Sequence, residues 1–282
     1  MENAQQNNRQ IPVIYLKPST GWLPLDFGEL WRYRELIFFL TWRDIKVRYK
    51  QAVLGIAWAV LQPLLTMAIF NLIFGVLLKT PSQGLPYPLF ALTALLPWQL
   101  FATALQRSSI SLVGNANLIT KIYFPRIAVP LATIFAALID FSVSFIVLLG
   151  VMAYYGVWPG LNILWLPLFV LLTLLTSLAV GLWLSALNVQ YRDIQHMVPF
   201  LVQVWMYASP IVYPIETIPA GLWRSLYSLN PMVGVIQGFR WSLIGGDRPD
   251  ITMLISVGVV LVLLISGLYY FRRMEKTFAD IV

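Results

Sequence analysis

Six long apolar stretches, separated by short segments that carry most of the charge, constrain this sequence more than any other feature. A hydrocarbon core about 30 Å thick requires about 20 apolar residues per helix, and the stretches are close to that length. Of the 282 residues, 59% are hydrophobic and 11% are charged, whereas soluble domains have about 25% charged residues. The sequence predicts an all-α integral membrane protein with spans at about 52–78, 88–105, 127–155, 164–187, 197–215 and 251–271.

The distribution of Lys and Arg between the connecting segments predicts the orientation. If the N-terminus is cytosolic, 15 of the 19 Lys and Arg residues fall on the cytosolic side, which is the side that carries excess positive charge. Residues 1–20 contain no continuous apolar run of the kind that a cleavable signal needs. We therefore expect both termini in the cytosol, with residues 1–51 as a cytosolic segment and residues 52–282 as the six-span membrane domain.

The composition argues against several kinds of site. The chain has no Cys and only one His, His196, so it offers neither thiolate ligands nor a histidine cluster for a metal ion. It contains no phosphate-binding G-x-x-x-x-G-K-[ST] loop and no G-x-S-x-G or H-E-x-x-H motif. The net charge of +7 comes from residues that flank apolar spans. We therefore expect neither a metal site nor a nucleic-acid partner.

The segment between the fifth and sixth stretches, residues 216–250, is partly apolar but is interrupted by Asn-Pro at 230–231. If it crossed the membrane, the three basic residues of the C-terminal tail would face outside, and its own arginines would each cost about 2.5–3.5 kcal/mol at mid-membrane. We expect instead two short helices, at about 220–228 and 232–244, that enter the outer face without crossing it. Irregular backbone at that depth must be buried in protein or line a water-filled cavity, which makes the segment a candidate gate.

Residues 36–50 combine an apolar stripe with a dense group of charges. Phe38, Trp42, Ile45 and Tyr49 share one face of a helical wheel, which predicts an amphipathic helix at the cytosolic interface of the membrane. The alternation around Val47 also fits a half-buried strand, but a lone strand beside a bilayer would have unpaired edges. The segment is either a basic anchor that fixes topology or, in addition, a docking site.

Residues 114–126 predict a short cytosolic helix with an Asn cap and a proline stop. Leu118 and Ile122 share a face. A small apolar surface on the cytosolic side suggests insertion into a groove of a partner. An ordinary interfacial turn explains the pattern equally well.

Asp140 is the clearest ionisable residue inside a predicted span. Such a residue is costly unless it pairs or faces water, so it is a functional candidate. Alternatively, it accepts hydrogen bonds from Ser142, Ser144 or another helix and is purely structural. Gln62 and Gln203 are more simply explained as contacts between helices.

Several aromatic residues fall in the first and fifth spans and are candidates for a path on which sugar rings stack. They also fit packing or the aromatic belts at the membrane interfaces. They are Trp58, Phe70, Phe74, Trp205 and Tyr207.

The sequence also contains five motifs in a fixed order: residues 43–58 with Gln62-Pro63, Tyr123-Phe-Pro-Arg126, Tyr191-Arg-Asp193, Ser209-Pro-Ile-Val-Tyr-Pro214 and Asn230-Pro231. Together they resemble the ABC-2 type permeases that export lipid-linked polysaccharides. The resemblance is strongest to the O-antigen (Wzm-like) branch, with the teichoic-acid permeases close to it. It extends over nearly the whole chain.

The resemblance implies a homodimer of six-helix subunits in the cytoplasmic (inner) membrane, bound to two copies of a separate ATPase subunit. ATP and Mg²⁺ would bind to that partner, with no cofactor in this chain. The implied substrate is an undecaprenyl-diphosphate-linked polysaccharide, with O-antigen favoured over teichoic acid or capsular polysaccharide.

The family pattern also implies roles for particular residues. Residues 36–50 would form the interface helix, including Trp42, Arg43, Lys46, Arg48, Tyr49 and Lys50, whose cations are candidates for contacting the lipid diphosphate or anionic phospholipid. Residues 115–124 would form the coupling helix in the ATPase cleft, including Asn117, Leu118, Ile119, Lys121, Ile122 and Tyr123. A second cytosolic contact would comprise Tyr191, Arg192 and Asp193. The first and fifth spans would line the channel, and the outer gate would include Trp223, Asn230, Pro231 and Arg240.

Two other classes of protein compete with this interpretation. A polytopic enzyme acting on a lipid-linked sugar would use Asp247 and Asp250 as metal ligands, although this pair is more simply a solvated loop. An ion-coupled secondary transporter would use Asp140 as its coupling site.

Overall fold

The computed structural model describes residues 27–50, 55–246 and 248–281, and within them it contains helices and no strand. This confirms the expected all-α fold. The α-helices are α1 Phe27–Arg32, α2 Arg34–Lys50, α3 Gly55–Phe70, α4 Tyr87–Gly114, α5 Ala116–Lys121, α6 Ala128–Tyr154, α7 Leu166–Gln190, α8 Ile194–Tyr207, α9 Leu222–Tyr227, α10 Pro231–Ile244, α11 Met253–Glu275 and α12 Phe278–Ile281. Short 3₁₀ segments occupy Leu161–Trp165 and Ile215–Thr217, and a π-helix occupies Asn71–Leu77.

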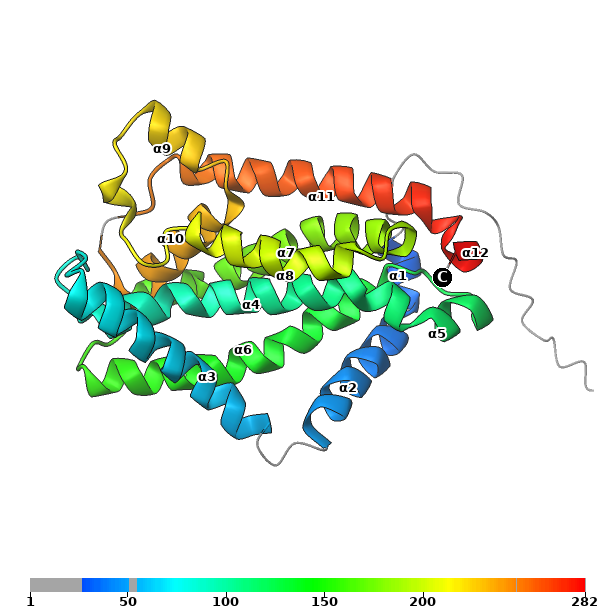
Figure 1. Ribbon diagram of the computed structural model, residues 1–282, viewed down its shortest axis with the longest axis horizontal. Coiled ribbons are helices and arrows are strands. Elements are labelled where there is room, and N and C mark those ends of the chain that lie inside the picture. The colour runs from blue at the N-terminus through cyan, green and yellow to red at the C-terminus, as the bar shows by residue number, and fades with distance from the viewer. Residues whose placement is uncertain (1–26, 51–54, 247, 282) are drawn as a thin grey trace, which may run out of the picture.

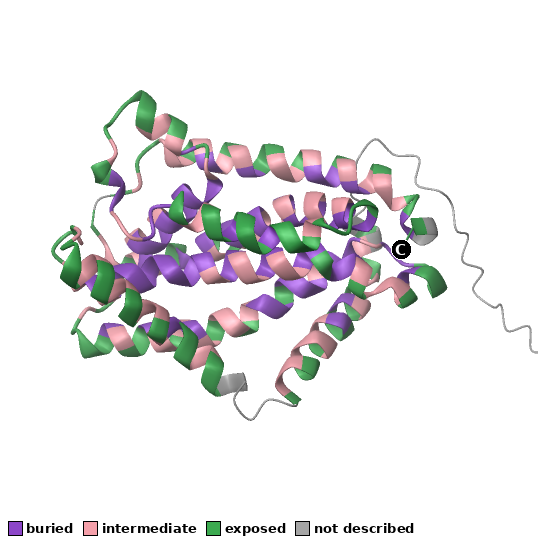
Figure 2. Cartoon of the chain, in the orientation of Figure 1, coloured by how far each residue is buried: buried purple, intermediate pink, exposed green. Residues whose placement is uncertain are grey.

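Helix α4 forms the centre of the bundle, and the other long helices pack around it (Figure 1). It contacts α3, α6, α7, α8 and α10. Of the residues in its most apolar 18-residue stretch, 78% are buried. By contrast, only 6% of the residues in the most apolar stretch of the first span, which contains α3, are buried. Figure 2 shows α3 as largely exposed. A single subunit therefore covers its central helix but leaves α3 open.

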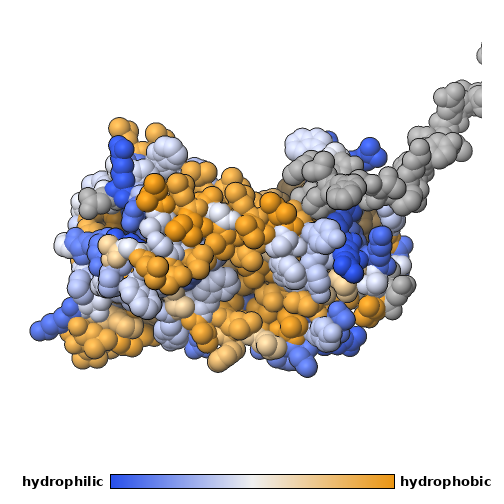
Figure 3. All heavy atoms as spheres, turned by 90° about the horizontal axis from the view of Figure 1, so that it is seen from above, coloured by the Kyte–Doolittle hydropathy of each residue, from blue (hydrophilic) through white to orange (hydrophobic). Residues whose placement is uncertain are grey.

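Among the residues that the structure describes, five helices are long and apolar enough to cross a membrane: Ala57–Leu77, Tyr87–Gly114, Ala128–Tyr154, Leu161–Gln190 and Met253–Glu275. Apolar side chains cover the middle of the molecule, and hydrophilic side chains gather towards its two ends (Figure 3). The five helices match the first, second, third, fourth and sixth predicted spans. The chain is therefore a multi-pass membrane protein.

The fifth predicted span, at 197–215, is shorter than expected. Its helix, α8, has 14 residues and ends at Tyr207. The chain continues as turns through Ser209-Pro210 to Pro214, because a proline interrupts helical hydrogen bonding and restricts the residue before it. Residues 208–215 are apolar, as expected for a span, but they form an irregular segment and not an α-helix.

In a helix, backbone N–H groups would donate to the carbonyls of residues 208–215. In this irregular segment the donors are side chains from α4, from α10 and from Asn230 just before α10. Asn230 Nδ2 donates to the Ala208 carbonyl at 2.9 Å, and Arg240 Nη2 donates to the Ile211 carbonyl at 2.7 Å. The Tyr87 hydroxyl donates to the Val212 carbonyl at 2.9 Å. Buried carbonyls without partners would be costly, so these bonds make a non-helical segment possible inside the bundle.

The two ends of the bundle differ in the elements that they carry (Figure 1). Helices α1, α5 and α12 gather at one end, which we call the α5 end. Helix α9, the loop at 78–86 and residues 245–246 and 248–250 lie at the other, which we call the α9 end. The short helices predicted at 220–228 and 232–244 are present as α9 and α10.

Close helix packing in the bundle depends on small residues, as Gly267 on α11 illustrates. A Cβ atom at Gly267 would lie 2.7 Å from the backbone oxygen of Ala179 on α7, whereas one at Gly258 on the same helix would meet no atom within 4 Å. We expect Gly267→Ala to lower the free energy of unfolding by about 1–3 kcal/mol through overpacking. Gly258→Ala is the matched control and should be neutral or slightly stabilising. Thermal unfolding of both variants in detergent would check this, and equal melting temperatures would contradict it.

Candidate functional site

Helix α2 packs against α6 at an incline (Figure 1). The contact begins where Thr41 Oγ1 donates to the Ala132 carbonyl at 3.3 Å, and it extends to Arg48, which reaches Asp140. The buried side of α2 includes Ile37 and Leu40, whereas Phe38 and Trp42 of the predicted stripe are exposed. The predicted helix is present, but its basic C-terminal end is not confined to the membrane surface, because it lies against the middle of a membrane-spanning helix.

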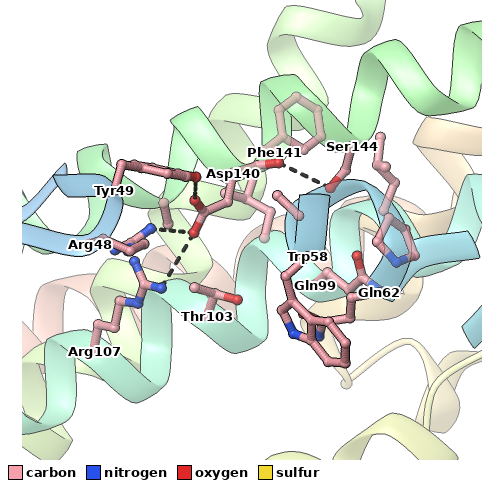
Figure 4. Close-up of a pocket in the computed structure, with 15 residues that line it drawn as sticks. Arg48, Tyr49, Trp58, Gln62, Gln99, Thr103, Arg107, Asp140, Phe141 and Ser144 are labelled. Atoms are coloured by element: carbon pink, nitrogen blue, oxygen red, sulfur yellow. Dashed lines mark hydrogen bonds and ion pairs between the residues drawn. The ribbon is translucent and has the colours of Figure 1, made fainter. Parts of the chain in front are cut away.

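Asp140 lies near the midpoint of α6, and its carboxylate contacts three side chains from two other helices (Figure 4). Arg48 pairs with Oδ2, and the Tyr49 hydroxyl donates to Oδ1. From α4, Arg107 Nη2 lies 3.4 Å from the same Oδ2. We call Arg48, Tyr49, Arg107 and Asp140 the Asp140 cluster. Burial and the hydrogen bond to Asp140 raise the pKa of Tyr49 to about 12, so its hydroxyl stays protonated and remains a donor at neutral pH.

The serine residues suggested as partners of Asp140 do not reach its carboxylate. Ser142 Oγ donates to the Leu138 carbonyl at 2.8 Å, and Ser144 Oγ donates to the backbone carbonyl of Asp140 at 3.0 Å. Both are local bonds to the carbonyl four residues earlier, as is common for serine in helices. The two serines are therefore not its partners, whereas the expected hydrogen bond from another helix is present, donated by Tyr49 on α2, and two arginines add ion pairs.

A cavity of about 290 Å³ adjoins the Asp140 cluster, between α2, α3, α4 and α6 (Figure 4). Gln99, Thr103 and Arg107 line it from one face of α4, at a spacing of four residues. Trp58 and Gln62 line it from α3, also four residues apart. The remaining lining is mostly apolar and includes Leu96, Leu100 and Phe141. The cavity therefore combines two guanidinium groups, neutral polar groups and an apolar wall.

Arg107 and Gln99 were not among the site residues predicted from the sequence. A signal was present, since Gln99 and Thr103 in the second apolar stretch and Arg107 just beyond its end recur every four residues and would share a face of a continuous helix. Of the basic residues proposed for α2, Arg48 alone lines the cavity. Lys46 and Lys50 are exposed.

Arg43 connects α2 to the junction between α4 and α5. Its guanidinium pairs with Asp44 at 2.8 Å and donates to Asn115 Oδ1, also at 2.8 Å. Asn115 occupies the N-cap position of α5, as expected, but its side chain accepts from Arg43 instead of from the backbone of α5. This contact joins the predicted interface helix directly to the predicted coupling helix.

The predicted coupling segment is an anchored helix with an exposed edge. Ile119 is 4% exposed, whereas Ile122 and Tyr123 are 56% and 63% exposed. The helix ends at Lys121, before the proline at 125, so Ile122 lies just beyond it and not on a shared helical face with Leu118. Asn117 and Lys121 are also exposed, as are Tyr191, Arg192 and Asp193 in the turn between α7 and α8. Both exposed groups lie towards the α5 end.

The C-terminal helix α12 packs against α5 and supports it. Phe278 is completely buried, and its ring meets that of Phe271 edge-on at 5.3 Å. Phe278 and Ile119 belong to the same apolar cluster. One turn earlier, Glu275 Oε1 accepts the backbone N–H of Arg126 at 3.0 Å. The two ends of the coupling segment are thus held by the end of α11 and by α12.

We expect Phe278→Ala to loosen α5 selectively. Deleting a buried aromatic ring costs about 3–5 kcal/mol where the site cannot collapse, and here the loss falls on the contact between α12 and α5. Amide hydrogen exchange in residues 116–121 should become faster, while exchange in α4 stays unchanged. Ile281→Ala, which removes an exposed apolar side chain from the same helix, should leave both unchanged. Equal exchange in the wild type and Phe278→Ala would contradict the supporting role.

The aromatic residues proposed as a channel lining occupy different environments. Trp58 and Tyr207 are 56% and 59% exposed. Trp205 donates from Nε1 to Asn230 Oδ1 at 2.8 Å and packs edge-on against Phe101 at 5.0 Å. Phe70 and Phe74 are partly buried against the main apolar cluster. The structure therefore leaves Trp58 and Tyr207 accessible and engages the other three in packing.

The proposed gate residues are largely structural within one subunit. Asn230 Oδ1 accepts the N–H of Met232 at 3.0 Å and so caps α10 just before Pro231. Arg240 is 8% exposed, and its guanidinium lies 3.7 Å from the centre of the Phe90 ring. Trp223 is 66% exposed on α9.

The geometry offers little support for a metal site. Asp250 pairs with Arg224 at 3.7 Å, and Asp247 lies outside the described residues. Within residues 27–50, 55–246 and 248–281, no three His, Asp or Glu side chains are grouped so that they could hold a metal ion.

A bundle of membrane-spanning helices, with a charged cavity beside the middle of α6, places the chain in the class of multi-pass membrane proteins. The chain belongs to the ABC-2 type transporter family, whose model matches residues 35–244. It is 34% identical to the O-antigen export system permease protein RfbA of Myxococcus xanthus, over 88% of this chain and 96% of that protein.

Two further relatives carry similar names. The chain is 31% identical to the O-antigen export system permease protein RfbA of Klebsiella pneumoniae, over 88% of this chain and 95% of the relative. It is 28% identical to the polysialic acid transport protein KpsM of Escherichia coli, over 83% and 91% of the two chains. The resemblance inferred from the five motifs is therefore confirmed.

Proposed function

We propose that this chain is the permease subunit of an ATP-driven exporter that moves a polysaccharide linked to undecaprenyl diphosphate, most simply an O-antigen, across the cytoplasmic membrane. The observation that carries the proposal is the family match together with near-full-length similarity to two O-antigen export permeases. The polysialic acid transport protein is more distant in identity, so a capsular polysaccharide is the second choice of substrate.

ATP hydrolysis takes place in a separate subunit. Support comes from the sequence, which has no G-x-x-x-x-G-K-[ST] loop to hold nucleotide phosphates. The α5 end faces the cytosol in this proposal, in agreement with the distribution of Lys and Arg. Ile122, Tyr123 and the turn at 191–193 then form the docking surface for the ATPase, since they are exposed at that end.

The functional unit is a homodimer in which α3 and α8 face the partner or the transport path. Both helices carry an exposed glutamine, Gln62 on α3 and Gln203 on α8. An amide facing hydrocarbon would lack hydrogen-bond partners, which favours contact with a second subunit or with water. The low burial of the first span in one subunit supports the same arrangement. Trp58 and Tyr207 then remain available for stacking against sugar rings.

Movement of the ATPase reaches the membrane domain through a short chain of contacts. Ile119 anchors α5, Asn115 at the start of α5 binds Arg43 on α2, and Arg48 on α2 binds Asp140 on α6. Displacing α5 would therefore shift α2 relative to α6, next to the cavity of the Asp140 cluster.

Purification from native membranes tests this assembly. An affinity-tagged chain, solubilised gently, should bring down an ATPase, and native mass spectrometry should give two copies of each subunit. A chain that purifies without any ATPase, and that transports in response to an ion gradient, would instead support the secondary-transporter alternative.

A further inference from the structure

The Asp140 cluster holds more hydrogen-bond donors than its carboxylate can accept. Arg48 and Arg107 both approach Asp140 Oδ2, and Tyr49 takes Oδ1. Arg107 Nη1 is buried and has no hydrogen-bond partner among the described residues. Two guanidinium groups against one carboxylate leave an excess positive charge, and a buried donor without a partner is costly. The cluster is therefore better suited to an anion with more acceptor oxygens.

Phosphate groups match these donors. Guanidinium groups bind phosphate through paired, charge-assisted hydrogen bonds, and a diphosphate offers more oxygens than one carboxylate. Gln99 and Thr103 add neutral polar groups on the same face of α4 as Arg107. The adjoining wall of Leu96, Leu100 and Phe141 is apolar, as the start of a lipid chain would require.

The size of the cavity limits what enters it. About 290 Å³ lies at the lower end of the range for small-molecule pockets, about 300–1,000 Å³. That volume suits a head group and excludes a polysaccharide chain. Trp58, which is 56% exposed at the edge of the cavity, leaves the α3 side accessible.

We propose that Arg48 and Arg107 form a binding site for the diphosphate of a lipid-linked substrate, and that the Asp140 carboxylate occupies these arginines when no substrate is bound. The proposal rests on the export function proposed above. Because two anions close together at low dielectric repel strongly, the diphosphate and the carboxylate exclude one another. Binding therefore breaks the contact between Arg48 and Asp140, which leaves the Tyr49 hydroxyl as the remaining hydrogen bond of the cluster between α2 and α6.

Equilibrium binding of farnesyl diphosphate to the intact complex in detergent tests the site. Asp140→Asn keeps the size of the side chain but removes the competing charge, so binding should become about tenfold tighter, equivalent to about 1.4 kcal/mol. Arg107→Gln should weaken binding by at least about tenfold, and Arg107→Lys, which keeps the charge without the paired donors, should lie between. Arg273→Gln removes an exposed basic residue of α11 and should have no effect. Unchanged or weaker binding by Asp140→Asn would overturn the proposal.

Two further probes distinguish the sources of phosphate. Inorganic pyrophosphate should compete with farnesyl diphosphate, but more weakly, because it lacks the lipid chain. Bicelles containing phosphatidylglycerol should compete poorly, and competition as strong as that of farnesyl diphosphate would overturn the assignment to a diphosphate.

The binding assay and the assembly test fail independently. A chain without an associated ATPase that still binds farnesyl diphosphate more tightly as Asp140→Asn would refute the proposed function and keep the site. An intact complex with ATPase subunits, in which Asp140→Asn and Arg107→Gln leave binding unchanged, would refute the site and keep the function.

Discussion

Ile122→Asp should reduce ATP-driven export by at least about tenfold while the membrane domain remains folded. Ile122 is 56% exposed in the isolated subunit and lies beyond the end of α5, so the substitution removes little internal packing. In the proposed complex the same side chain is covered by the ATPase. An aspartate there loses apolar contact of about 1.5–3 kcal/mol and places an unpaired charge in the interface.

The measurement is export by the purified complex, with melting temperature as the control for folding. Ile122→Leu preserves an apolar side chain of similar size and should transport normally. If Ile122→Asp transported at the wild-type rate with the ATPase still bound, residue 122 would not belong to the coupling surface.

Arg240→Met should lower the free energy of unfolding by about 3 kcal/mol. The guanidinium donates to the carbonyls of Ile211 and Tyr213, at 2.7 and 3.4 Å, and covers the Phe90 ring. Hydrogen bonds to a charged group are worth about 1.5–3 kcal/mol each, and the avoided cost of burying the cation offsets part of their loss. The carbonyls of Ile211 and Tyr213 would then lose a donor that helps to hold the segment in its non-helical path.

Thermal unfolding in detergent and hydrogen exchange in residues 208–214 would detect the change. Arg248→Met is a matched control, since Arg248 is exposed at the same end of the molecule. A wild-type melting temperature for Arg240→Met would show that the irregular segment does not depend on this arginine.

The long helices were predictable because apolar length and charge interruption are local properties of the sequence. The second span shows the limit of that signal. Hydropathy ended it at Leu105, but α4 continues to Gly114, because Gln106, Arg107 and the serines that follow are compatible with a helix that leaves the apolar layer. Likewise, the short helices α9 and α10 followed from the Asn-Pro interruption and from charge placement.

The C-terminal end of the fifth span was predicted wrongly because it depends in part on contacts with residues far away in the sequence. Nothing local in residues 208–214 reveals that Asn230 and Arg240 will donate to their carbonyls. Pro210 and Pro214 interrupt the helix locally, but the apolar composition conceals where the span ends, and the distant donors make the non-helical path possible. The same interactions explain why residues predicted as gate elements from the family pattern are structural inside one subunit.

Asp140 shows how far the site itself could be predicted. Its position within a span made it a candidate. Of its partners, however, Arg48 lies 92 residues away in the sequence and Arg107 lies on another span. Periodicity identifies a polar face on α4, and only the packing of α2 against α6 brings that face, the carboxylate and Arg48 together.

Reconstitution of the chain with its ATPase into proteoliposomes, supplied with an undecaprenyl-diphosphate-linked polysaccharide, tests the export function most directly. Polysaccharide should become accessible on the opposite side of the membrane only when ATP is hydrolysed, and the rate should fall to background when the ATPase is omitted. Transport that proceeds equally without the ATPase, or ATP hydrolysis with no polysaccharide crossing the membrane, would contradict the proposed function.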